Sequence, residues 1–140
     1  MEKNGMKTNR LLWEAHRAAS NIGLLKFPKA LGSTAFDLAL VKNSLFGKCS
    51  PLLDAKKSLA ANVKDLDGLE LGALTPEDRR RYREFEEAWE ALLDKEVSWE
   101  PPVQILKDAL VRLEGIEPND LSALLSAGVL IITKKEEDAD

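Results

Sequence analysis

The sequence predicts a mainly α protein, a compact domain of about five to six helices with a short two-stranded β ribbon. Apolar residues recur at spacings of three and four over most of the chain, which is the period of an amphipathic helix. Capping residues and prolines precede several of these segments, and only two short segments show a strand pattern. At 140 residues and 44% apolar, the chain has the usual size of one domain, which we expect over residues 1–133 with a sub-boundary near residues 67–74.

The first predicted helix covers residues 9–22. Thr8 is a suitable N-cap for it and Gly23 a suitable stop. Trp13 and His16 lie three residues apart and therefore share a face of this helix. His16 is the only histidine in the chain and no catalytic triad surrounds it, so we expect a partly exposed neighbour of Trp13 rather than a catalytic residue.

Leucine returns every seventh residue in the next segment, at Leu31, Leu38, Leu45, Leu52, Leu59 and Leu66. The spacing resembles a leucine zipper, but Gly47 and Pro51 would cost about 1 and about 3 kcal/mol in a helix interior. We therefore expect a break or kink between them, with Pro28 opening a helix before it and Pro51 opening one after it. The leucines are interpreted as a stripe buried inside the monomer, and Cys49, the only cysteine, as a small core residue.

The clearest helix start is Thr75-Pro76-Glu77-Asp78. It offers a threonine N-cap, a proline at the first helical position, and two acids where the helix dipole favours negative charge. An aromatic-rich stripe follows to about residue 95, and we expect it to pack in the core. Its members are Tyr82, Phe85, Trp89, Leu92 and Leu93.

The polar side of this helix carries its charges in an unusual order. Arginines crowd the first half and acids fill the second, whereas the helix dipole favours anions early and cations late. Because stability alone does not favour this order, we predict a surface that contacts a partner; a merely solvated helix face is the alternative. The residues of the predicted surface are Arg79, Arg80, Arg81, Arg83, Glu84, Glu87, Glu90 and Asp94.

The last third of the chain mixes short strands and helices. Residues 96–100 alternate with period two, and residues 129–133 are apolar and β-branched, so these two strands can pair as the ribbon. Helices are expected over residues 103–114 and 119–127, each followed by a glycine. The acidic tail, residues 134–140, is expected to be disordered.

The sequence lacks the residues that several kinds of functional site require. A structural zinc site needs about four Cys and His ligands, whereas the chain has one of each, and its eight glycines form no phosphate-binding loop. The chain also lacks an apolar run of the ~20 residues that span a bilayer. We therefore expect a cytoplasmic, non-enzymatic protein with no membrane segment, metal or cofactor. The 24 acidic residues keep a carboxylate-based hydrolase as an alternative.

The charges divide along the chain. Residues 1–64 carry 11 Lys and Arg against four acids, a net charge of +7, whereas residues 65–140 carry nine against 20, a net charge of −11. Packing of one part on the other is the simpler explanation for this division. The alternative is nucleic-acid binding by the lysine-rich first part, with Lys42, Lys56 and Lys57 as candidate phosphate contacts along one helix side.

The order of elements resembles that of small helical accessory proteins of tailed bacteriophages. The resemblance rests on a leucine-rich helical segment at residues 24–66, FEEAWEALLDKEVSW at residues 85–99, and IEPNDLSALLSAG at residues 116–128. It implies a protein that acts by binding, on host machinery such as RNA polymerase or a defence nuclease, or else a minor assembly factor. We therefore expect a protein-binding accessory factor or inhibitor, located in the host cytoplasm if it is encoded by a phage.

Overall fold

The computed structural model of the chain describes residues 5–132, apart from the side chain of Leu71. The mainly α class predicted from the sequence is confirmed. Three short 3-10 helices, η1 (Lys29–Leu31), η2 (Ala61–Leu66) and η3 (Leu71–Ala73), connect the longer elements. Those elements are β1 (Met6–Thr8), α1 (Asn9–Gly23), α2 (Gly32–Ala60), α3 (Pro76–Leu93), β2 (Glu96–Ser98), β3 (Ile105–Leu106), α4 (Lys107–Val111), α5 (Pro118–Ser126) and β4 (Leu130–Ile131).

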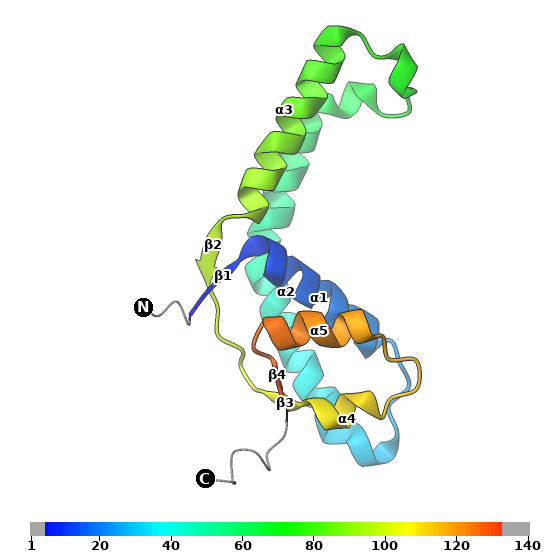
Figure 1. Cartoon of the computed structure of the whole chain (residues 1–140), viewed down its shortest axis with the longest axis vertical. Coiled ribbons are helices and arrows are strands. Elements are labelled where there is room, and N and C mark those ends of the chain that lie inside the picture. Colours follow the sequence, from blue (N-terminus) through cyan, green and yellow to red (C-terminus); the bar gives the residue numbers. More distant parts are fainter. Residues whose placement is uncertain (1–4, 133–140) are drawn as a thin grey trace.

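The molecule is elongated and has two parts, as Figure 1 shows. α1, α4, α5 and the N-terminal half of α2 lie together at one end, and we call this part the body. The C-terminal half of α2 and α3 run side by side away from the body as a two-helix hairpin. We call this hairpin, residues 51–93, the arm.

The hydrophobic core lies in the body. Elements far apart in the sequence contribute to it, including both halves of the charge division. The indole Nε1 of Trp99 donates a hydrogen bond to the carbonyl of Ala127 at 2.8 Å, so this buried polar atom is satisfied. The buried cluster consists of Leu12, Ala15, Ala18, Ala19, Ile22, Leu38, Val41, Leu45, Cys49, Trp99, Ile105, Leu110, Leu113, Leu124, Ala127, Val129 and Leu130.

The first helix forms as predicted. The Thr8 hydroxyl accepts a hydrogen bond from the amide of Leu11 at 3.2 Å, so it caps α1. Trp13 and His16 are both half-buried, and His16 lies beside Phe46 of α2 with 5.8 Å between the ring centroids. Burial and the charge of Lys42 lower the pKa of His16, which favours the neutral imidazole.

The chain does not break near Gly47 and Pro51, because α2 continues through both residues, but its two halves run in different directions in Figure 1, so the predicted alternative of a kink fits the structure. Proline removes one backbone hydrogen bond, but buried residues precede and follow this point along the helix. Tertiary packing on both sides therefore outweighs the local propensity. The interpretation of the leucines is confirmed for four of the six: Leu38, Leu45, Leu52 and Leu66 are buried within the chain, whereas Leu31 and Leu59 are half-buried.

The strand pairing differs from the prediction. β2 pairs antiparallel with β1, and β4 pairs parallel with β3, so the two predicted strands do not form a ribbon with each other. The prediction missed β1 and β3 because each is only two or three residues long and shows no alternating pattern. Thr133 and the predicted disordered tail, residues 134–140, lie outside the described residues.

The helix predicted over residues 103–114 is also shorter than expected. Ile105 is drawn into a strand by its pairing with Leu130, and its amide donates to the carbonyl of Val129 at 2.8 Å. Helix α4 begins only after this pairing and covers five residues. The final helix, α5, forms close to its predicted bounds and is followed by Gly128, whose φ of 77° suits only glycine.

Candidate interaction surface at the end of the arm

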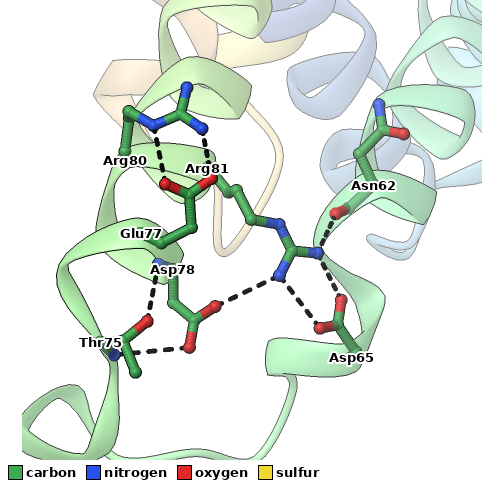
Figure 2. Close-up of polar contacts among 7 residues, drawn as sticks. All are labelled: Asn62, Asp65, Thr75, Glu77, Asp78, Arg80 and Arg81. Atoms are coloured by element: carbon green, nitrogen blue, oxygen red, sulfur yellow. Dashed lines mark hydrogen bonds and ion pairs between the residues drawn. The ribbon is translucent and has the colours of Figure 1, made fainter.

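The end of the arm is a compact turn between α2 and α3. η2, a turn at Gly68 and η3 lead the chain to Thr75, where α3 begins. The Thr75 hydroxyl accepts from the amide of Asp78 at 3.1 Å, and the Asp78 carboxylate accepts from the amide of Thr75 at 3.4 Å. This capping box confirms the predicted helix start (Figure 2).

Most of the aromatic stripe on α3 is not in the core, contrary to the prediction. Phe85 and Trp89 are half-buried, Tyr82 is 41% exposed, and only Leu93 in the stripe is buried. The physical reason is the two-helix construction of the arm. Two helices bury only the strip between them, because no third layer covers their sides.

Arg81 links the two sides of the turn at the end of the arm. Its Nη2 donates to the Asp65 carboxylate at 2.7 Å and to the carbonyl of Asn62 at 2.6 Å, and its Nη1 lies 3.3 Å from an oxygen of Asp78 (Figure 2). The hydrogen bond from Arg81 lowers the pKa of Asp65. Arg81 thus joins η2 to the start of α3 and is occupied by intramolecular contacts.

Arg80 also forms ion pairs, but only with acids of its own helix, α3. It pairs with Glu77, and its Nη1 donates to Glu84 at 2.7 Å. The hydrogen bond from Arg80 lowers the pKa of Glu77. These side chains are exposed, and surface ion pairs of this kind contribute little to stability.

The acids at the other end of α3 join the arm to the body. Arg10 of α1 pairs with Glu90, and its Nη2 lies 3.2 Å from the carboxylate of Asp94. Among the described residues, this is the one ion-paired contact between the basic first part of the chain and the acidic second part. The two parts pack on each other as predicted, with α1 against α5 and α2 against α3, but within residues 5–132 ion pairs join them only at Arg10.

The remaining members of the predicted surface, Arg79, Arg83 and Glu87, are exposed and make no ion pair within residues 5–132. Arg79 and Arg83 line a groove of about 630 Å³, together with Tyr82 and Glu86. These four residues follow the spacing i, i+3, i+4 and i+7 and so share one face of α3. We call this cavity the tip groove.

The opposite wall of the tip groove is mainly apolar. It comes from the turn that leads into α3 and consists of Leu66, Gly68, Leu69 and Leu74, with one acid, Asp67, among them. Leu69 is 49% exposed there, although leucine favours burial. The groove therefore combines exposed apolar side chains, one aromatic ring and two arginines that bind no other part of the described chain.

The three lysines predicted as phosphate contacts do not form one site. Lys42, Lys56 and Lys57 are all exposed on α2, but Lys42 and Lys56 stand about 21 Å apart along the helix axis. The ammonium of Lys56 lies 4.9 Å from the ring centroid of Trp89 and 6.0 Å from that of Trp13. Lys56 therefore makes an intramolecular cation–π contact where α1, α2 and α3 meet.

Other chemistry has little support within residues 5–132. No group of three His, Cys, Asp or Glu residues there is arranged to hold a metal ion, and no helix in that range is long and apolar enough to cross a membrane. Cys49 is buried in α2, and burial raises its pKa to about 11. Its thiol is consequently protonated and behaves as the small core residue predicted from the sequence.

Comparison of the chain with protein-family models, with curated proteins and with solved structures gave no match. Function is therefore inferred from the geometry of the chain itself. Sequence reasoning identified the two free arginines but missed Leu69, Tyr82 and Glu86 as their neighbours in the tip groove. The helical spacing of Arg79, Tyr82, Arg83 and Glu86 was a usable signal, whereas the wall at residues 66–69 depends on how the turn folds back.

Proposed function

We propose that the protein is a non-enzymatic protein-binding module and that the tip groove is its contact surface. The observation that supports this proposal best is that the four arginines at the start of α3 differ in whether an acid of the same chain binds them. Arg80 and Arg81 are held by acids of the same chain, while Arg79 and Arg83 flank Tyr82 over a mainly apolar groove and pair with no acid of residues 5–132.

The composition of the groove suits protein recognition. Tyrosine and arginine are enriched among the residues that contribute most to binding at protein interfaces. An arginine can donate two parallel hydrogen bonds to one carboxylate, and exposed Leu69 supplies apolar area beside it. The partner surface that fits is one in which carboxylates surround an apolar side chain.

The arm also presents this groove far from the core. Arg81 and the capping box hold the turn, so the groove is shaped before a partner arrives. Such a module suits the accessory or inhibitory role on host machinery, such as RNA polymerase or a defence nuclease, that the resemblance to phage proteins implies. We include that role, and the alternative of a minor phage assembly factor, as part of the proposal.

Nucleic-acid binding is the second candidate. Lys56 and the rings of Trp13 and Trp89 combine a cation with aromatic surfaces, which is the combination that binds single strands. The wide separation of the lysines and the existing contact of Lys56 with the rings make this candidate weaker than protein binding.

The test is affinity capture from lysate of the source or host cell with a tagged full-length chain, with and without nuclease. We expect a stoichiometric protein that survives nuclease treatment and is lost from the variant R79Q/R83Q. The control variant K57Q/K64Q removes the same charge from the same arm and should retain the partner. Tyr82→Ala should weaken capture by about tenfold or more, because aromatic contacts at the centre of an interface are large.

Two results would contradict the proposal. Equal capture by the wild-type chain and by R79Q/R83Q would exclude the tip groove as the contact surface. Capture that disappears with nuclease, and that K57Q/K64Q also lacks, would favour the nucleic-acid candidate, whose affinity should fall steeply with salt.

A further inference from the structure

A second groove lies at the root of the arm, on the side where α2 passes the end of α3 and the strand β2. It measures about 620 Å³, which is within the range of known binding sites. Ser44, Gly47 and Pro51 of α2 form one wall, and Lys95 and Val97 contribute from the segment after α3. We call this cavity the root groove.

Gly47 leaves open space on the wall of the root groove. A Cβ built at Gly47 would meet no neighbouring side chain or other element within 4 Å. Its backbone is helical rather than left-handed, so its φ does not require glycine. The missing side chain therefore lets a ligand approach the α2 backbone closely from outside.

Pro51 weakens the helix at the same place. In an α-helix the carbonyl of Gly47 would accept from the amide of residue 51, but proline has no N–H, so this backbone hydrogen bond is missing. Gly47 and Pro51 both line the root groove, and their small or rigid side chains keep its wall low.

The charged side chains that line the root groove have one sign. Lys48 and Lys95 line it, and none of its described lining residues is acidic. Lys7 stands directly opposite Val97 in the β1–β2 register, so the two share a face of the ribbon. None of these three lysines makes an ion pair within residues 5–132; Lys48 makes one hydrogen bond, to the hydroxyl of Ser98 at 3.4 Å.

We propose that the root groove binds an acidic peptide segment of a partner protein, in which apolar residues alternate with carboxylates. The lysines match the carboxylates, and the apolar floor that includes Leu52 and Val97 matches the apolar residues. This site is separate from the tip groove and does not depend on the proposal made for it.

The test uses fluorescence polarisation of the full-length chain with a labelled peptide of about 12 residues in which Asp alternates with Leu or Val. A peptide with Lys in place of Asp is the control. We expect saturable binding of the acidic peptide alone, weakened by about tenfold in K48Q/K95Q and weakened further by salt. Because the arginines of the tip groove can also attract the acidic peptide, K48Q/K95Q is compared with the wild type in the R79Q/R83Q background as well; a tenfold loss of affinity that persists there belongs to the root groove.

Gly47→Ala is the sharpest variant because folding and binding should change in opposite directions. The added methyl group has room in the free chain and favours the helix, so the melting temperature should rise by about 3 °C. The same methyl group occupies the groove and should weaken peptide binding by at least about fivefold. Unchanged peptide affinity in both G47A and K48Q/K95Q, equal binding of the two peptides, or no saturable binding of the acidic peptide would overturn the proposal.

Discussion

The body and the arm use the same long helix in different ways. In the body, α2 is covered by α1 and by the C-terminal segments, and Leu38, Val41 and Leu45 are almost completely buried. In the arm, the same helix has only α3 and the turn beside it, and its apolar residues are mostly half-buried. The difference indicates that the body contributes most of the folding stability. The arm buries less of its apolar surface and leaves more of it exposed.

Two contacts keep the arm in place against the body. Lys56 lies over the rings of Trp13 and Trp89, which meet edge to face with 6.2 Å between centroids. Arg10 pairs with Glu90 and Asp94 near the C-terminal end of α3. Both contacts lie near the root, so the far end of the arm depends on its own internal contacts.

The largest expected effect contrasts matched leucines on α2. Leu45→Ala in the body should lower the free energy of unfolding by about 3 kcal/mol, because a fully buried leucine leaves a cavity. Leu59→Ala, at a half-buried position in the arm, should lower it by about 1 kcal/mol. Urea denaturation measures both, and equal losses would contradict the difference between body and arm.

A smaller effect is expected at the start of α3. Thr75→Ala removes the side-chain oxygen that accepts from the Asp78 amide, and loss of such a cap lowers stability by about 1 kcal/mol. Thr75→Ser keeps the hydroxyl and should stay close to the wild type. If the two variants unfold at the same urea concentration, the capping box does not stabilise the arm.

Arg81→Gln should have a local effect. It removes the hydrogen bonds to Asp65 and Asn62, so amide hydrogens of residues 61–75 should exchange faster while those of the body keep their rates. Arg83→Gln, on the same helix but without an internal partner, should leave exchange unchanged. Similar exchange in both variants would show that Arg81 does not fasten the turn.

Acid should loosen the same turn over a defined pH range. The pKa of Asp65 is lowered below its ordinary 3.8 by the hydrogen bond from Arg81. Its contribution is therefore complete above pH 3.8 and is lost as the pH falls through the lower folded-state value. Amide chemical shifts of residues 61–75 should move below that pH in the wild type and less in D65N; equal movement would assign the change to other acids such as Glu77.

Local signals in the sequence predicted those parts of the fold that local chemistry determines. Thr8 and Thr75 cap helices as expected, and Gly128 ends α5 because it alone suits the left-handed backbone there. Local propensity failed where tertiary packing outweighed it. α2 crosses Gly47 and Pro51 because buried residues on both sides hold it, and Ile105 leaves its predicted helix to pair with Leu130.

The candidate site was predictable only in part, for a related reason. The order of charges on α3 drew attention to the arginine cluster, but all four arginines look alike in the sequence. Only the folded turn distinguishes Arg81, which reaches Asp65, from Arg79 and Arg83, which reach no acid in the described part of the chain. The mainly apolar wall at residues 66–69 likewise arises from the way the turn folds back on α3.

The most direct measurement of the central claim is a hydrogen-exchange footprint of the full-length chain with and without its captured partner. We predict that the partner protects amides of residues 66–86, which form the tip groove, and leaves those of α1 and α5 at the rates of the free chain. Protection confined to α1, α5 or the lysine side of α2, with residues 66–86 unchanged, would contradict the claim that the arm presents the contact surface.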